Sequence, residues 1–177
     1  MDLNDIISYL KESKAAPLVK METDDGMRGA NGSYDWWKHI IQLNEDLDPA
    51  HFNTTLIHEY THALDNQIKK ESQLSGFDGP SQRQLQEQLP KLRQNSFPSY
   101  TNEERRYRNN PGESLAFGVA HTQPNADIHW SQKAYNPHQD YTRHTEADIM
   151  LDLARRAREE RNRPKPSFID GLRGMFR

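Results

Sequence analysis

Two histidines and a glutamate occur together in the segment His58-Glu59-Tyr60-Thr61-His62. Residues four positions apart lie on one face of an α-helix, so both imidazoles can bind a single metal ion with Glu59 beside them. A chain of this composition is expected to contain the pattern by chance only about 0.02 times. The alternative is a pair of metal-free helix histidines, but the apolar flanks predict a buried helix, where histidines need polar partners. The segment therefore predicts a metal site, with Zn²⁺ as the expected ion and Glu59 placed to hold a metal-bound water.

A catalytic zinc site takes three protein ligands and keeps a fourth position for water. No third histidine follows at short spacing, and the carboxylate that we expect instead is Glu113. Pro111 at the first helical position would place Glu113 in the first turn of a helix. The alternative is that Glu113 completes a capping box with Asn110 and needs no metal. Glu103 or Glu104 is the reserve candidate for the third ligand.

Asp65 lies one turn after His62 on the same predicted helix face. A carboxylate in this position can orient a ligand histidine through the ring nitrogen that does not bind the metal. It can equally be an exposed helix residue, and the sequence favours neither interpretation.

The segments 58–65 (HEYTHALD) and 113–117 (ESLAF), about fifty residues apart, resemble the gluzincin class of zinc metallopeptidases. Their spacing is most similar to that of lethal-factor-like and small effector-type gluzincins, although the match covers only about a tenth of the chain. The resemblance implies a zincin-like fold and the hydrolysis of peptide bonds. It also implies that His58, His62 and Glu113 bind zinc and that Glu59 is the general base.

The same resemblance implies a tyrosine, upstream of the third ligand, that stabilises the oxyanion of the reaction. Tyr107 is the nearer candidate and Tyr100 the other. Neither matches the spacing of the family, so both are kept as candidates. The family also carries an acidic residue one turn after the third ligand. Phe117 occupies that position here, so this contact is lost or supplied by another residue.

Helices and a small sheet must position these side chains. The predicted elements and the resemblance together imply a zincin-like α+β fold with a small, twisted, mixed sheet. We expect the motif helix to lie beneath this sheet and a second helix to bring Glu113 to the metal. The expected elements are a helix over residues 3–10, a strand over 18–22, a strand over 36–43, a helix from Asp48-Pro49 to about Lys70, a helix around Leu85, Leu89 and Leu92, a helix from Asn110-Pro111 to about His121, an irregular segment over 122–144, and a last helix capped by Thr145.

Zincins generally bind their substrate extended along an edge strand above the motif helix. The strand over 36–43 is the candidate, with Ile40, Ile41 and Gln42 as the substrate-binding residues. Backbone pairing would hold the polypeptide and side-chain pockets would select it. We expect Trp36 and Trp37 to be core anchors, with substrate contact as the alternative.

The chain of 177 residues contains no cysteine, which excludes disulfides, cysteine-ligated zinc and thiol catalysis. No apolar run approaches the length of a membrane helix, and the N-terminal residues do not resemble a secretory signal. These features are compatible with the cytoplasm, with delivery into another cell or with a phage-encoded protein. We expect a single metallopeptidase domain over 1–163, with a polar insertion or lid over 71–110, and a basic tail over 164–177.

Residues 155–177 carry eight basic and three acidic side chains, a net charge of +5 in a chain whose net charge is −3. This end could bind nucleic acid or an acidic partner in an assembly, or its cations could simply favour the end of the preceding helix. Two functions follow. The leading hypothesis is a zinc-dependent endopeptidase with a polypeptide substrate, and the alternative is an inactive zincin-fold scaffold that uses its basic end.

Overall fold

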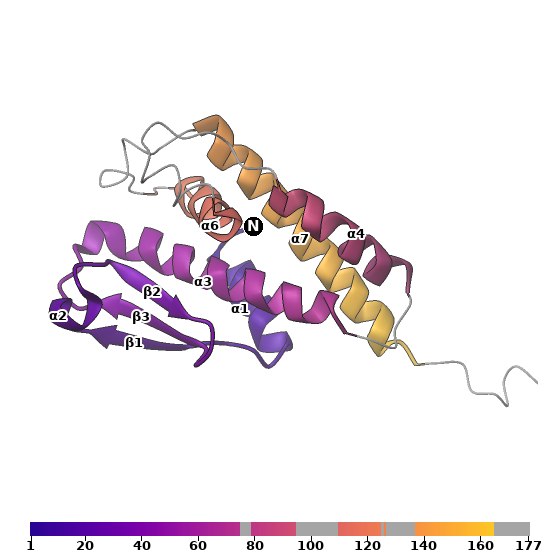
Figure 1. Cartoon of the computed structure of the whole chain (residues 1–177), viewed down its shortest axis with the longest axis horizontal. Helices are drawn as coiled ribbons and strands as arrows, with labels where there is room; N and C mark the ends of the chain where they lie inside the picture. Colours follow the sequence, from indigo (N-terminus) through magenta and orange to yellow (C-terminus); the bar gives the residue numbers. More distant parts are fainter. Residues whose placement is uncertain (75–78, 95–109, 125, 127–136, 165–177) are drawn as a thin grey trace, which may run out of the picture.

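A computed structural model describes residues 1–74, 79–94, 110–124, 126 and 137–164 (Figure 1). These residues form an α+β fold with a small mixed sheet, as the sequence predicts; the sheet has three strands, and the described residues form six helices. Of the helices in these ranges, none is both long enough and apolar enough to cross a membrane. The helices are α1 (Leu3–Glu12), α2 (Asp24–Met27), α3 (Pro49–Ser72), α4 (Pro80–Gln94), α6 (Pro111–His121) and α7 (Pro137–Asn162).

The sheet has the strand order β1-β3-β2, formed by β1 (Leu18–Glu22), β2 (Gly32–Asp35) and β3 (Ile40–Asn44). Strand β1 runs parallel to β3, and β2 runs antiparallel to it. The middle strand β3 is therefore paired along both of its edges. Strands β1 and β2 form the two edges of the sheet.

The predicted strand over 36–43 is wrong at its start and wrong in its place in the sheet. Residues 36–39 form the turn between β2 and β3, and β3 is the middle strand rather than an edge. The Asp35 carboxylate closes this turn by accepting hydrogen bonds from the backbone N–H groups of Trp37 (3.0 Å) and Lys38 (2.9 Å). His39 ends the turn with a left-handed φ of 58°. The sequence pattern did not predict β2.

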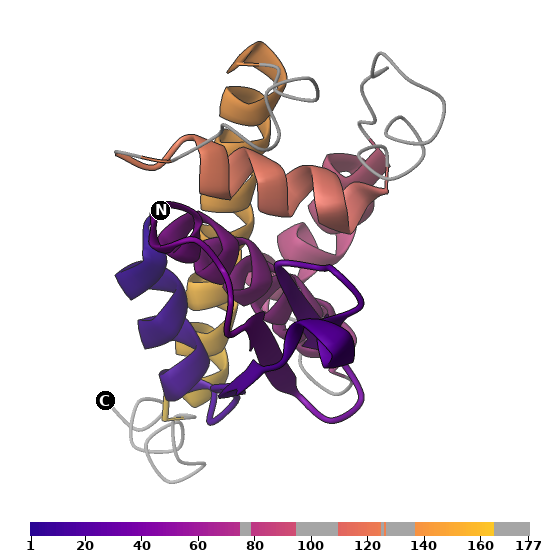
Figure 2. The ribbon, with the colours of Figure 1, turned by 90° about the vertical axis from the view of Figure 1, so that its left-hand side faces the viewer.

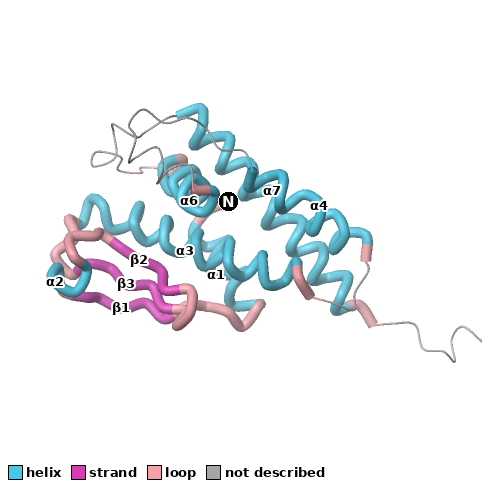
Figure 3. The backbone as a smooth tube through the Cα atoms, viewed as in Figure 1, coloured by secondary structure: helices cyan, strands magenta, loops and turns pink. Residues whose placement is uncertain are grey.

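Helix α3 lies across the fold, with the sheet on one side and α6 and α7 on the other (Figures 1 and 3). It begins as predicted: Asp48 is its N-cap and accepts a hydrogen bond from the backbone N–H of Ala50 (2.9 Å), and proline follows the cap. Ile41 and Leu43 of β3 are fully buried. The motif helix therefore contacts neighbours on both sides, which explains why polar side chains on it are buried.

Helix α6 crosses α7 at close range, in an orientation that is clear in Figure 2. At the crossing, a Cβ atom on Gly118 would lie 2.8 Å from the backbone oxygen of Asp140 and would overlap Arg143. Only glycine fits there. The crossing places the N-terminal turn of α6, with Glu113, beside α3.

The last helix begins earlier than the sequence pattern indicates. Helix α7 starts at Pro137, so residues 137–144, expected to be irregular, are helical. Thr145 is not its cap, because its hydroxyl donates to the backbone oxygen of Tyr141 one turn earlier. The physical reason is that proline is well tolerated in the first turn of a helix.

The predicted insertion over 71–110 contains helix α4 among its described residues. Helix α4 packs against α7, and Gln82 donates hydrogen bonds to the backbone oxygens of Glu71 (2.9 Å) and Ser72 (3.1 Å) at the end of α3. A lid formed by residues 95–109 stays a prediction that lies outside the described residues.

Candidate metal site

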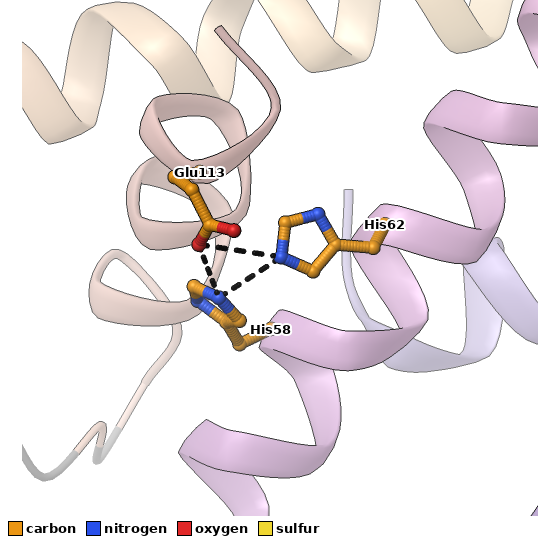
Figure 4. A group of neighbouring side chains, drawn as sticks. All are labelled: His58, His62 and Glu113. Atoms are coloured by element: carbon orange, nitrogen blue, oxygen red, sulfur yellow. Dashed lines mark hydrogen bonds and ion pairs between the residues drawn. The ribbon is translucent and has the colours of Figure 1, made fainter. Parts of the chain in front are cut away.

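His58, His62 and Glu113 point toward one another across the gap between α3 and α6 (Figure 4). The Nε2 atoms of the two histidines lie 3.1 Å apart. The Oε2 atom of Glu113 lies 3.2 Å from Nε2 of His58 and 3.4 Å from Nε2 of His62. The three atoms therefore form a nearly equilateral triangle.

This triangle fits a metal ion by its size and by the chemistry of its corners. Four ligands at about 2.0–2.1 Å from a tetrahedral zinc ion lie about 3.4 Å from one another. Each of the three atoms is a nitrogen or oxygen with a lone pair, and hydrogen bonds cannot satisfy all three atom pairs at once. A single cation at the centre would contact all three lone pairs, so the group can hold a metal ion.

The first turn of α6 positions Glu113 as the sequence predicts. Asn110 is the N-cap, and its side-chain oxygen accepts a hydrogen bond from the backbone N–H of Gly112 (3.0 Å). The carboxylate of Glu113 points at the two histidines instead of at the Asn110 backbone, so the capping-box alternative is excluded. Glu103 and Glu104, the reserve ligands, lie outside the described residues.

The ring of Phe117, where the gluzincin pattern has an acid, packs edge-on against His58. The two ring centroids are 4.6 Å apart at an interplanar angle of 67°. The Nδ1 atom of His58 is buried and has no hydrogen-bond partner among the described residues. Packing against Phe117, rather than a hydrogen bond to Nδ1, therefore holds this ring in place.

Burial and mutual contact shift the pKa values of the triad in different directions. Burial lowers the pKa of His58 to about 4, against the opposing effect of its hydrogen bond with Glu113. Burial alone would also lower the pKa of His62, but the nearby carboxylates, Glu113 first, raise it overall. The pKa of Glu113 lies well below its usual range, because contact with the two histidines outweighs its burial. At neutral pH the triad thus offers an ionised carboxylate and a neutral His58.

Glu59 is buried beside the triad, between α3 and β2. A Cβ atom on Gly32 of β2 would lie 3.0 Å from its Oε1 atom and 2.7 Å from a methyl carbon of Thr55, so this strand approaches as closely as glycine permits. Burial raises the pKa of Glu59 to about 7, with Glu113 adding to the shift and His62 opposing it. A carboxyl group with this pKa can take up and release a proton near neutral pH.

Asp65 is buried, which excludes the alternative of an exposed helix residue. Its Oδ2 atom forms an ion pair with Lys69 (2.6 Å). This oxygen and Nδ1 of His62 lie 3.9 Å and 3.8 Å from the point where a Cβ on Gly112 would be, so both border the same small space. The charge of Asp65 also contributes to the raised pKa of His62. The position suits a carboxylate that orients His62.

A cleft of about 530 Å³ opens onto His62 and Glu113 of the triad. Their side chains are 17% and 19% exposed, so these two ligands are reachable from the solvent. The lining comes from β2 and its turn, α3 and the start of α6: Gly32, Ser33, Tyr34, Trp36, Glu59, His62, Asp65, Asn66, Lys69, Asn110, Gly112 and Glu113.

The strand that borders this cleft is β2, not the strand that the sequence suggested. Ile40, Ile41 and Gln42 lie in the middle strand and are not among the lining residues. They have no free strand edge to offer a polypeptide, because β1 and β2 pair with both sides of β3. Tyr100 and Tyr107 lie outside the described residues, so their role stays a prediction.

Two further residues of the cleft wall, Tyr34 and Asn66, did not emerge from the sequence. The Tyr34 hydroxyl accepts a hydrogen bond from the Asn66 amide (3.0 Å) and donates one to Nδ1 of His39 (2.6 Å). Nε2 of His39 in turn donates to the backbone oxygen of Ala15 (2.6 Å). The one available signal was Asn66, which follows the motif by one turn and therefore lies on the same side of the helix.

Comparison of the chain with models of known protein families, with curated proteins and with solved structures gives no match. The interpretation of the site therefore rests on its own geometry. That geometry is a His58, His62 and Glu113 group able to hold a metal ion, consistent with an H-E-x-x-H motif and a downstream glutamate.

Proposed function

We propose that the protein is a zinc-dependent endopeptidase of the gluzincin type with a zincin-like fold. The observation that carries this proposal is the convergence of three metal-binding atoms beside the buried carboxylate of Glu59, at the floor of an open cleft. Two imidazole nitrogens and one carboxylate oxygen form a donor set that favours zinc over magnesium or calcium, which prefer oxygen ligands.

A zinc ion held by these residues would lower the pKa of a water molecule toward about 7 and polarise the carbonyl group of a peptide. Glu59 would take a proton from this water as the water oxygen bonds to the carbonyl carbon, and would pass the proton to the amide nitrogen, so that the C–N bond breaks to give a carboxyl group and a free amine. Its position between α3 and β2 and its raised pKa support this role. Tyr107 or Tyr100 is proposed to stabilise the oxyanion.

A polypeptide substrate is proposed to lie extended along β2. This strand is paired with β3 on one side only, and it borders the cleft next to Glu59. Backbone hydrogen bonds to an edge strand bind a substrate without regard to its sequence. Gly32 supports this arrangement because it brings the strand against the catalytic carboxylate.

The alternative scaffold function relied on the basic C-terminal end. Four of its eight basic side chains form ion pairs within the chain: Arg155 with Asp5, Arg156 with Asp152, Arg158 with Glu12 and Glu71, and Arg161 with Glu71. Contact with a partner or nucleic acid would therefore depend mainly on Arg163 and on residues 165–177. The buried carboxylate of Glu59 beside the triad, which a metal-bearing scaffold does not need, gives the endopeptidase the stronger support.

The proposal is tested by metal content and by hydrolysis, each with a matched variant. We expect one zinc per chain in protein purified without chelators, and a loss of that zinc in Glu113→Ala. We also expect the zinc-loaded protein to cleave an unfolded protein, and Glu59→Gln to abolish cleavage while it keeps the metal. Zinc binding without cleavage in the wild type would favour the inactive scaffold, and no zinc binding would overturn both.

A further inference from the structure

The turn between β2 and β3 holds two tryptophans in solvent at the rim of the cleft. Trp36 is 58% exposed and Trp37 is 81% exposed, although core positions were expected for both. Their rings stack on each other, with centroids 4.6 Å apart and an interplanar angle of 18°. Trp36 lines the same cleft as Glu59 and Glu113. The pair thus forms an aromatic surface continuous with the proposed active site.

This surface is held in position by its surroundings. The Asp35 carboxylate accepts two backbone hydrogen bonds within the turn and pairs with the ammonium group of Lys38 (3.4 Å). The base of the turn is tied to the rest of the fold through Tyr34 and His39. Exposed apolar surface that is already ordered can be buried by a ligand with little further loss of conformational entropy. These features suit a binding surface.

We propose that Trp36 and Trp37 determine specificity by binding a large apolar or aromatic side chain of the polypeptide substrate. The inference rests on the proposed endopeptidase function, which it extends to the class of substrate. Charged groups at this rim are paired with each other, Lys38 with Asp35 and Lys69 with Asp65. The surface therefore favours a neutral side chain, and indole rings stack well on other aromatic rings.

The position of the selected side chain follows from the geometry of β2. Gly32 lies against Glu59 and marks the place of the bond to be cut. Trp36 follows four residues later, which corresponds to about 13 Å along an extended chain. A substrate that lies along β2 would therefore present its aromatic side chain about three to four residues away from the cleaved bond.

Affinity selection from a random dodecamer peptide pool tests the proposal independently of turnover. The zinc-loaded Glu59→Gln protein serves as the bait, because it is expected to bind peptides without cutting them. We expect phenylalanine, tyrosine, tryptophan and leucine to be enriched roughly tenfold at one position, which corresponds to about 1.4 kcal/mol. The same protein with Trp36→Ala and Trp37→Ala should lose this enrichment.

Tyr141→Ala in the same background is the matched control, because Tyr141 is an exposed aromatic residue of α7 outside the cleft lining. It should keep the enrichment. The proposal is overturned if apolar residues are not enriched, if the enrichment survives loss of both tryptophans, or if lysine and arginine are selected in their place. Each variant is first checked for unchanged zinc content and circular dichroism.

Incubation of the selected peptides with the zinc-loaded wild type then separates the two proposals. Cleavage three to four residues from the aromatic residue supports both, and cleavage at other distances overturns the substrate position proposed here. Peptides that bind through the tryptophans but are never cut would refute the endopeptidase function and leave the aromatic binding surface standing.

Discussion

Helix α3 carries two polar clusters, one at its midpoint and one at its C-terminal end, and they satisfy their charges in different ways. The first cluster contains His58 and His62, which face Glu113. The second is centred on Glu71, about 16 Å further along the helix axis. Both clusters join α3 to another helix, but in the second the carboxylate pairs with arginines.

The Glu71 cluster is a charge-matched contact among α1, α3 and α7. The carboxylate of Glu71 accepts from the guanidinium groups of Arg158 (2.7 Å) and Arg161 (2.8 Å) and from the amide of Gln67 (2.9 Å). Arg158 also lies over the ring of Tyr9, with its Cζ atom 3.9 Å from the ring centroid. Both oxygens of the Glu71 carboxylate therefore meet donors.

The metal triad is different, because each imidazole Nε2 atom can either donate or accept, so hydrogen bonds cannot satisfy all three of its mutual contacts at once. A basic side chain between these atoms would convert the triad into a structural ion pair like that of Glu71. The triad contains no lysine or arginine, and a bound cation would supply that charge. The comparison teaches that the identity of the facing groups, rather than burial or closeness, distinguishes a metal site from a structural contact.

The largest effect is expected when the third ligand is removed. Glu113→Ala should lower zinc affinity by more than about 100-fold, because loss of a ligand exceeds the 10–100-fold effect of altering an outer partner. Competition with a chromophoric chelator measures this change. Glu71→Gln, a change in the other cluster, should leave the affinity unchanged; an equal loss in both variants would contradict the distinction between the clusters.

The free energy of unfolding, unlike zinc affinity, should depend on the Glu71 cluster. Glu71→Gln should lower the free energy of unfolding of the metal-free protein by about 2 kcal/mol, because it removes the buried anion that two partly buried guanidinium groups share. Urea denaturation provides the measurement. The matched control is Asp152→Asn, which removes an exposed pair with Arg156 and should cost at most about 0.5 kcal/mol. Similar losses of stability in the two variants would show that the Glu71 cluster stabilises the fold no more than an exposed ion pair does.

A smaller effect is expected for the carboxylate behind His62. Asp65→Asn should weaken zinc binding about tenfold, because the amide no longer stabilises the orientation and basicity of the imidazole. Isothermal titration calorimetry would detect it. Lys69→Met is the control, since it removes the cation paired with Asp65 and keeps the carboxylate. If only the Lys69 variant weakens binding, Asp65 has no role toward His62.

The smallest expected effect is the dependence of the free energy of unfolding on pH. Burial would raise the pKa of Glu71, but hydrogen bonds from Arg158 and Gln67 outweigh it and lower the pKa in the folded chain. A depressed carboxyl pKa stabilises the fold above the unfolded value of about 4.3, and this stability is lost as the pH falls through the lower folded value. Chemical denaturation from pH 6 to pH 3 should show the gap between wild type and Glu71→Gln narrowing below pH 4.3. A constant gap would mean that the ionised carboxylate is not what stabilises the contact.

Local rules account for the parts of the molecule that the sequence predicts correctly. The spacing of His58 and His62, the cap at Asp48 and the proline after Asn110 act within one or two helical turns, so their structural consequence can be derived from neighbouring residues alone. For the same reason the motif helix and the helix of Glu113 begin where the pattern indicates.

Contacts between elements account for the rest. No residue near Trp36 indicates that a four-residue strand precedes it, that the next strand has both edges paired, or that the tryptophans face solvent. β2 and β3 pair as a hairpin over residues 32–43, whereas the parallel pairing of β1 with β3 joins residues 22 positions apart and makes β3 the middle strand. The Glu71 contact joins residues almost ninety positions apart. Local geometry thus specified the groups that can bind a metal. Packing specified the strand beside them and the cluster that needs no metal, because burial depends on residues from several elements.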